Sequence, residues 1–193
     1  MDKSNQQASS RDIDLSWLAA ALESEGWFIF HVSDRRKKGR RIEVNPEVGL
    51  CNSDWSFTQT CNDIGRKWIT GCYLKTKTRD RNPSKHSPSH QIIWAGMKRT
   101  KSVIDAILPY MRSIRKRQAA QLLLDFIDDR FNQTKNGCFR PFSNKQIATL
   151  IELKRLNGKR NGIAKGTLEK LQRLQTEQYK DIDDIVQTVP MGR

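Results

Sequence analysis

The sequence predicts an α+β fold in which helices cover one face of a four-stranded antiparallel sheet. Amphipathic segments follow one another in the order helix, two strands, helix, two strands, helix, helix. Because the strands come in pairs joined by loops, hairpins are expected, and the helices then gather on one side of the sheet. The 193 residues suffice for one such domain and a small appendage.

The first helix is predicted over residues 14–25, because three leucines recur at the spacing of one helical face. These are Leu15, Leu18 and Leu22. Asp14 is a suitable N-cap, and Gly26 stands where glycine commonly ends a helix. Residues 1–11 are polar and contain no apolar run, so we expect a disordered N-terminal arm there.

Two strands are predicted over residues 27–34 and 41–50, where apolar and polar side chains alternate. The apolar, core-facing set comprises Phe28, Phe30, Val32, Ile42, Val44, Pro46, Val48 and Leu50. Proline cannot donate a hydrogen bond to a neighbouring strand, so Pro46 predicts a sheet edge or a bulge at its position.

The same periodicities predict the remaining elements. They are a helix over 52–64, strands over 68–79 and 90–98, and helices over 102–111, 115–131, 143–156 and 165–179. Asn52 or Ser53 is expected to cap the first of these helices. A break at Gly137 and Pro141 divides a core domain, residues 12–135, from a C-terminal helical extension, residues 140–193.

The charge of the chain predicts a polyanionic partner. It holds 35 Lys and Arg against 21 Asp and Glu, a formal net charge of +14. Nucleic acid is the simplest partner for this excess, and a ribosomal type of RNA-binding protein is one alternative. No segment approaches the roughly 20 apolar residues of a membrane span, and we expect no secretory signal. The four cysteines lack the Cys-x-x-Cys spacing of zinc sites, so reduced thiols are expected.

The first helix carries two further signals. Small residues stand four apart on a face other than the leucine face: Ser16, Ala20 and Ser24. Such a ridge lets two helices approach closely, either within the chain or between two copies of it. The helix pattern has no second copy in the sequence, so pairing of two such helices would need two chains.

Glu25 lies at the C-terminal end of this helix, where the helix dipole disfavours a carboxylate. A cation would compensate it. If two copies pack through the small ridge, two Glu25 carboxylates meet, and divalent ions would neutralise them. Mg²⁺ bound by few carboxylates together with phosphates and water fits that demand. Glu23 points to another side of the helix and is expected to be solvated or hydrogen-bonded.

Residues 18–26, Leu-Ala-Ala-Ala-Leu-Glu-Ser-Glu-Gly, followed by Trp27 and Phe28, resemble the LAGLIDADG motif of homing endonucleases. Leu18, Ala19 and Gly26 match that motif identically. Ala21 replaces a larger apolar residue, and both acids are Glu rather than Asp. The resemblance extends over residues 12–131 through the αββαββα order. It includes the segments Asn52-Ser53-Asp54, Trp68-Ile69 and Leu108 to Ala119.

The resemblance implies roles for several residues. Glu25, with Gly26, would bind the catalytic Mg²⁺, or Mn²⁺ or Ca²⁺ in a crystal. Asn52 would order the attacking water. Arg115 matches a basic residue that is commonly Lys, with its neighbour Lys116 as the second candidate. The implied reaction is metal-assisted hydrolysis of one phosphodiester on each DNA strand.

In this fold the sheet lies in the major groove, so the residues opposite the core are the candidates for DNA contact. They are Ile29, His31, Ser33, Arg35, Arg40, Glu43, Asn45, Glu47, Tyr73, Lys75, Lys77, Arg79 and Gln91. The acids among them could accept from cytosine amino groups. A strand of about ten residues spans roughly 33 Å, so a two-fold dimer would cover roughly twenty base pairs of a pseudo-palindromic site. The basic loop 154–165 would add phosphate contacts.

The expected partners are therefore double-stranded DNA and a second copy of the chain, without a membrane. Ser16, Ala20 and Ser24 form the expected dimer interface. Two alternatives on the same fold remain open, an RNA-binding maturase that acts on intron RNA and a catalytically silent DNA-binding protein. A chloroplast, a mitochondrion or a bacterial cytoplasm would suit the family and the reduced cysteines, and secretion is not expected.

Overall fold

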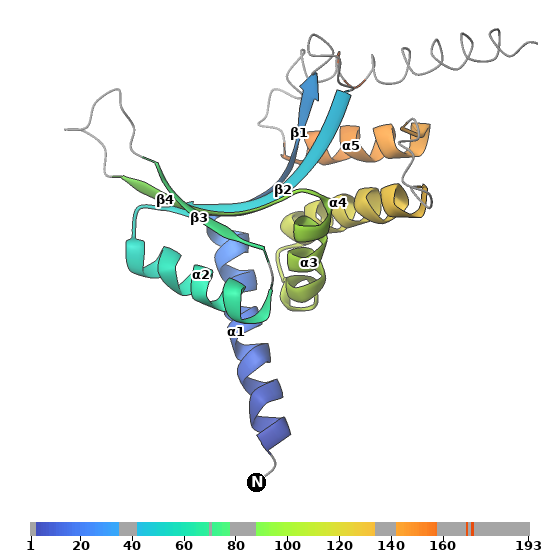
Figure 1. Ribbon diagram of the computed structural model, residues 1–193. Helices are drawn as coiled ribbons and strands as arrows, with labels where there is room; N and C mark the ends of the chain where they lie inside the picture. The colour runs from blue at the N-terminus through green and yellow to red at the C-terminus, as the bar shows by residue number, and fades with distance from the viewer. Residues whose placement is uncertain are drawn as a thin grey trace, which may run out of the picture.

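The computed structural model describes residues 3–34, 42–69, 71–77, 88–133 and 142–157, and the single residues 169 and 171. A curved sheet lies over a layer of helices (Figure 1). The helices are α1 (Lys3–Glu25), α2 (Trp55–Trp68), α3 (Met97–Ile107), α4 (Ile114–Gln133) and α5 (Asn144–Asn157), with a 3-10 turn η2 (Leu108–Tyr110). The strands are β1 (Gly26–Asp34), β2 (Ile42–Asn52), β3 (Tyr73–Lys77) and β4 (Ser89–Ala95).

The four strands are antiparallel and lie in the order β1-β2-β4-β3. The predicted α+β class is therefore confirmed. The apolar face of the sheet is buried as the alternation predicted, and Phe28, Phe30, Val48 and Leu50 are at most 1% exposed. The leucines of α1 pack into the same core, which also takes in Trp94 of β4 and Phe126 of α4.

Pro46 lies in a central strand, yet its missing N–H disturbs no ladder. The pairing of β2 with β4 begins only at Glu47, opposite Ala95. The Pro46 carbonyl accepts from the Gly96 N–H at 2.9 Å, so the backbone polar atoms of Pro46 face the side where β4 has ended. The predicted edge is confirmed at this point, and the register with β1 runs through it without a bulge.

Helix α1 begins at Lys3, so the segment predicted as an irregular arm is helical from residue 3. Asp14 is then inside the helix, and its prediction as N-cap was wrong. Its Oδ2 accepts from Trp68 Nε1 at 2.7 Å and from Lys67 Nζ at 2.9 Å. These bonds explain the choice of an acid there, because they join α1 to the last turn of α2.

The cap of α2 is Asp54, so the prediction of Asn52 or Ser53 was wrong. Asp54 Oδ1 accepts from the backbone N–H of Ser56 at 2.8 Å and of Phe57 at 3.2 Å, as an N-cap does. Asn52 ends β2, and its Oδ1 accepts from the Asp54 N–H at 2.9 Å. One polar residue therefore supports the next at this junction.

The third strand is shorter than predicted, because Trp68 and Ile69 end α2 instead of opening β3. The bond from Trp68 to Asp14 and the burial of Ile69 at 2% exposure hold this turn of helix in place. Gly71 then reverses the chain at φ 87°, a conformation that favours glycine. Gly96, at φ 90°, likewise allows α3 to begin at Met97, five residues before its predicted start.

Helix α5 begins with a reciprocal cap, which confirms the predicted helix to within one residue at each end. The Gln146 N–H donates to Ser143 Oγ, and the Ser143 N–H donates to Gln146 Oε1, both at 3.1 Å. The predicted helix over 165–179 falls outside the described residues except at two positions. Among the helices of the described ranges, none has the length and apolar character to cross a membrane.

Candidate catalytic centre and nucleic-acid interface

Glu25 is the last residue of α1, and its side chain is exposed. It makes no hydrogen bond or ion pair with any residue that the structure describes. Gly26 follows as the first residue of β1. A Cβ at Gly26 would clash with the backbone of Leu22, including its Cα at 2.8 Å, so the direct turn from helix into strand requires glycine here. The direct junction of α1 with β1 therefore fixes the backbone position of Glu25.

Glu23 is hydrogen-bonded, as expected. Its Oε1 accepts from the backbone N–H groups of Arg112 and Ser113, both at 2.6 Å. Charge-assisted bonds of this kind are stronger than those between neutral groups. They join the last turn of α1 to the residues that lead into α4, and so bring the first turn of α4 beside Glu25.

Lys116, on the first turn of α4, is the basic residue that contacts Gly26 and lies within the electrostatic influence of Glu25. It is half-buried, and its Nζ donates to the Gly26 carbonyl oxygen. Burial lowers the pKa of this ammonium group and the charge of Arg115 adds to that effect, while Glu23 and Glu25 act in the opposite direction. A carboxylate, a backbone carbonyl and an ammonium group thus lie together where α1 enters the sheet.

Arg115 lies elsewhere. Its Nε and Nη2 both donate to the Leu156 carbonyl, at 2.9 and 2.6 Å. The guanidinium group is therefore bound to the last turn of α5. Of the two basic candidates, the structure brings Lys116 and not Arg115 into contact with the end of α1.

Asn52 lies at the same end of the sheet. Gly26 pairs with Leu50, so Asn52 is two residues beyond the first pair of the β1–β2 ladder. It pairs with His90 on β4. Because its Oδ1 accepts from Asp54, the amide nitrogen of Asn52 is the atom left to donate to a ligand.

The oxygen donors at this site suit a hard divalent cation in kind, but one chain supplies few of them. The Glu25 carboxylate has no hydrogen bond or ion pair among the described residues, and Gly26, the next residue along the chain, adds a backbone carbonyl. Within the described ranges, no three acidic, histidine or cysteine side chains are grouped to hold a metal ion. Mg²⁺ commonly takes one or two carboxylates and fills its other positions with water and phosphate oxygens. The donor set fits that mode, with further ligands coming from outside the chain.

Three cysteines are free thiols, Cys51, Cys61 and Cys72. Burial raises the pKa of Cys61 to about 12, so its thiol is protonated and inert at neutral pH. The reduced state of the cysteines in the cell stays a prediction. Cys138 lies outside the described residues.

The predicted DNA-contact residues that the structure describes with their side chains are all at least partly exposed, opposite the core. His31, Glu43, Asn45, Tyr73 and Lys75 are exposed, and Ile29, Ser33, Glu47 and Gln91 are intermediate. Gln91 Oε1 is buried without a partner among the described residues. Lys77 ends β3, with only its backbone described, and Arg35, Arg40 and Arg79 lie outside the described residues.

Trp27 is a feature of this face that the sequence interpretation missed. Its Nε1 donates to Glu47 Oε1 at 2.9 Å, and His31 Nε2 lies 3.5 Å from Glu47 Oε2. A Cβ at Gly49, which pairs with Trp27, would lie 2.6 Å from Trp27 Cζ2. A glycine opposite a tryptophan was the signal for an indole lying flat on the sheet. As a result, Glu47 is oriented from two sides.

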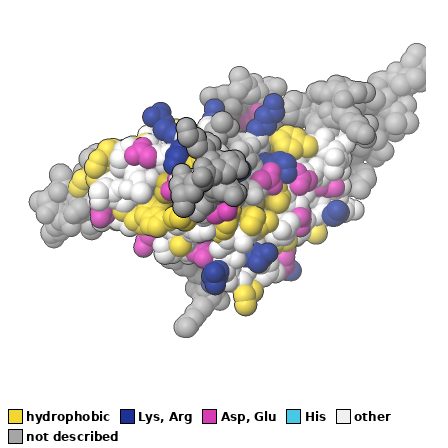
Figure 2. All heavy atoms as spheres, turned by 90° about the horizontal axis from the view of Figure 1, so that it is seen from below, with side chains coloured by type: hydrophobic (Ala, Val, Ile, Leu, Met, Phe, Trp, Pro, Cys, Tyr) yellow, Lys and Arg dark blue, Asp and Glu magenta, His cyan; other side chains and the backbone are white. Residues whose placement is uncertain are grey.

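The predicted ridge of α1 is exposed at each of its three positions, Ser16, Ala20 and Ser24. It therefore does not pack against another helix of the described chain. The same face presents Ile13 and Trp17, which are 66% and 39% exposed. Figure 2, which views the molecule from below, the side toward which α1 projects in Figure 1, shows several hydrophobic side chains on the surface. An apolar helix face of this kind is typical of an interface.

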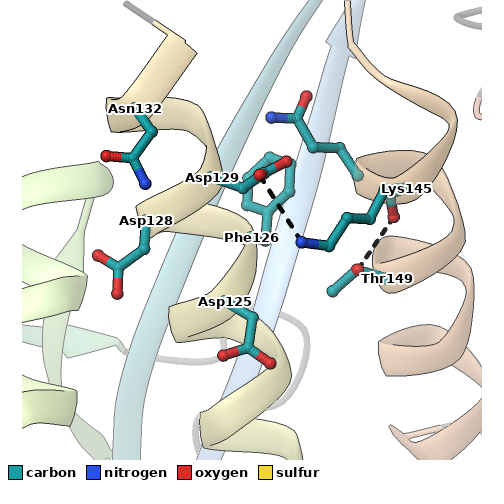
Figure 3. A pocket seen from close by; sticks show the side chains of 8 residues that line it. Asp125, Phe126, Asp128, Asp129, Asn132, Lys145 and Thr149 are labelled. Carbon is teal, nitrogen blue, oxygen red and sulfur yellow. Dashed lines mark hydrogen bonds and ion pairs between the residues drawn. The ribbon is translucent and has the colours of Figure 1, made fainter.

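A separate pocket of about 280 Å³ lies between α4 and α5 (Figure 3). Asp125, Asp128, Asp129 and Asn132 of α4 line it, with Lys145 of α5 on the other side. Asp129 lies roughly 20 Å along α4 from Lys116, at 1.5 Å per residue. Lys145 lies 3.9 Å from Asp129, and Lys101 lies 2.8 Å from Asp128, so these charges are paired within the chain.

Comparison with known proteins places the fold. No protein-family model and no curated protein matches the chain. Among solved structures, the homing endonuclease I-CvuI, in complex with uncleaved DNA in the presence of Mg, is 15% identical at a TM-score of 0.56. The match covers 88% of this chain and 97% of I-CvuI. The group I intron-encoded homing endonuclease I-CeuI, complexed with DNA, is 12% identical at a TM-score of 0.57, over 82% of this chain and 75% of that one.

A third structure, the LAGLIDADG meganuclease I-CpaMI bound to uncleaved DNA, is 14% identical at a TM-score of 0.57. The match covers 85% of this chain and 50% of I-CpaMI. The chain therefore has the LAGLIDADG homing endonuclease fold, as its sequence predicted.

Proposed function

We propose that the protein is a homing endonuclease that works as a homodimer and cuts both strands of a long, pseudo-palindromic DNA site with Mg²⁺. One observation carries the proposal. The Glu25 carboxylate, which has no hydrogen bond or ion pair with any described residue, lies near the half-buried ammonium group of Lys116, at the end of an exposed ridge of small residues. Such a pairing of groups suits the binding of a metal ion and a phosphate at one place.

The homodimer rests on α1. Its exposed small residues would let a second α1 approach closely, and Ile13 and Trp17 would be removed from water in the same contact. The chain matches nearly all of I-CvuI but half of I-CpaMI, so it corresponds to one of two halves in the longer protein. Two-fold packing along α1 would bring the two Glu25 residues together at its end.

Each residue at the centre then has a role. Glu25 would hold the metal ion, with the Gly26 carbonyl as an adjacent oxygen. Bound Mg²⁺ would stabilise charge on the phosphate and make a bound water more acidic. Lys116 would neutralise negative charge on the scissile phosphate. Asn52 would orient the attacking water through its side-chain amide nitrogen, because its side-chain carbonyl oxygen already accepts from the Asp54 N–H.

The outer face of the sheet would read the bases. His31, Asn45 and Lys75 are exposed there and offer donors and acceptors to a major groove. Glu47, held by Trp27 and His31, would offer a fixed acceptor. The net charge of +14 would attract the duplex and make binding weaken as salt rises.

The test is cleavage of a DNA library with Mg²⁺, followed by assays of single variants on the selected site. Glu25→Gln is expected to bind DNA and fail to cut it. Glu152→Gln is the matched control, since Glu152 is an exposed glutamate on α5. If the wild-type protein cuts no DNA but binds intron RNA tightly, the protein is an RNA-binding member of the fold and this proposal is wrong.

A further inference from the structure

The outer edge of β1 is covered by side chains and not by another described strand. Among the described strands, β1 pairs only with β2, so one of its edges has no neighbouring strand in this part of the chain. Carbonyls of alternate residues project from the same edge of a strand. Those of Gly26, Phe28 and Phe30 accept, in turn, from Lys116, from Asn157 Nδ2 at 2.6 Å and from Lys154 Nζ at 3.3 Å.

Two of these three donors come from the last turn of α5. Lys154 is half-buried, and its Nζ also lies 4.6 Å from the centre of the Phe30 ring. A buried ammonium group is costly unless it has partners, and here it has a carbonyl and an aromatic face. Its position is therefore fixed by the strand edge. The same turn of α5 offers the Leu156 carbonyl to Arg115.

The contacts form a closed ring. Lys116 is bonded to Gly26, two residues from Phe28 on β1. Phe28 is bonded to Asn157, the neighbour of Leu156 on α5. Leu156 is bonded to Arg115, the neighbour of Lys116 on α4. A helix turn held on both sides in this way has little freedom to move relative to the strand.

We propose that Arg115 and the last turn of α5 position Lys116 for DNA cleavage. This inference rests on the proposed function. Arg115 is then a positioning residue that acts through Lys116, and it does not touch DNA or the metal ion. Arg115 would not be needed merely to cover the edge of β1, since Asn157 and Lys154 already donate to the Phe28 and Phe30 carbonyls. The bidentate bond to Leu156 adds the link from that cover to the first turn of α4.

The support can be tested by a double-mutant cycle on the single-turnover cleavage rate, measured with saturating protein. Arg115→Gln is expected to slow cleavage about 10- to 100-fold, the usual effect of losing a supporting contact around a site. Binding of the same DNA, measured with Ca²⁺ in place of Mg²⁺, is expected to stay within about twofold. In the background of Lys116→Met, Arg115→Gln should cause no further loss, because it acts through the missing side chain.

Arg117→Gln is the matched control, an exposed arginine two residues along the same helix, and should leave the rate unchanged. Asn157→Ala removes a link of the ring without altering α4, so it should repeat the non-additive loss even if Arg115→Gln folds poorly. Equal losses in the two backgrounds, or a loss of DNA binding in Arg115→Gln, would overturn the positioning role alone. A wild-type protein that binds DNA and never cuts it would overturn the proposed function as well.

Discussion

The end of α1 and the pocket between α4 and α5 both present carboxylates, and they differ in what those carboxylates already bind. In the pocket, Asp128 lies 2.8 Å from Lys101, and Asp125 accepts from Gln121 at 2.8 Å. At the end of α1, Glu25 has no hydrogen bond or ion pair with any described residue. Each of the three pocket acids, Asp125, Asp128 and Asp129, therefore has a hydrogen bond or an ion pair within the chain, and Glu25 has neither among the described residues. The number of carboxylates therefore does not identify the site. What distinguishes Glu25 is that no described residue forms a hydrogen bond or an ion pair with its carboxylate.

The largest expected effect comes from neutralising one carboxylate at a time in the two regions. Glu25→Gln is expected to reduce the cleavage rate by at least about 100-fold, the scale of losing a group that stabilises charge in the transition state. Asp129→Asn should leave the rate within about twofold, because the Asp129 carboxylate already forms an ion pair with Lys145. Equal losses from the two variants in a single-turnover assay would show that the pocket is part of the reaction.

A second test concerns dimerisation. Ala20→Leu should force the small ridge apart, and overpacking typically costs about 1–3 kcal/mol. The dissociation constant of the dimer, measured by sedimentation, should then rise roughly tenfold or more. Ala148→Leu makes the same change at an exposed alanine of α5, beside the pocket, and should not shift the equilibrium. An unchanged dimer in Ala20→Leu would place the interface elsewhere.

A third test compares two acids through stability. Glu23→Ala removes two bonds to backbone N–H groups, so we expect a loss of about 1–3 kcal/mol in the free energy of unfolding. Asp125→Ala removes one exposed bond to Gln121 and should change it by no more than about 0.5 kcal/mol. Urea denaturation measures both. Similar values for the two variants would mean that Glu23 does not anchor the start of α4.

The smallest effect concerns Asp14 and pH. Its bond from Trp68, and then that from Lys67, lower the pKa of Asp14 in the folded protein. The carboxylate therefore adds stability above its unfolded pKa of about 3.9, and this is lost as pH falls through the lowered folded value. Asp14→Asn should thus be less stable than wild type at pH 7, by less than about 1 kcal/mol because water screens the pair. The difference should shrink below pH 4 in thermal unfolding, and a difference that grows there would contradict the assignment.

The order of elements could be predicted because local periodicity determines it. The leucines of α1 and the alternation around Phe28 and Phe30 report burial directly. The choice between Arg115 and Lys116 could not be predicted in this way. Adjacent residues on a helix point about 100° apart. Which of the two contacts Gly26 depends on how α4 packs against α1, through Glu23, and against α5, whose Leu156 is 41 residues further along the chain.

Competition among neighbours limited the prediction of caps and contacts as well. Asn52, Ser53 and Asp54 are all good N-caps, and in the structure it is Asp54 whose side chain accepts from the first backbone N–H groups of α2. The bond between Trp27 and Glu47 joins residues 20 positions apart, through a strand register that the sequence predicts only in outline. Such contacts depend on tertiary geometry, so they come from the structure.

The covered edge of β1 also bears on how the protein behaves outside its reaction. A bare strand edge beside Phe28 and Phe30 is a template on which a second chain can add a strand. If the chain ended before α5, Asn157 and Lys154 would be missing and two carbonyls of β1 would be exposed. We expect such a truncated protein to aggregate by edge-to-edge pairing, so covering this edge would be a second consequence of α5.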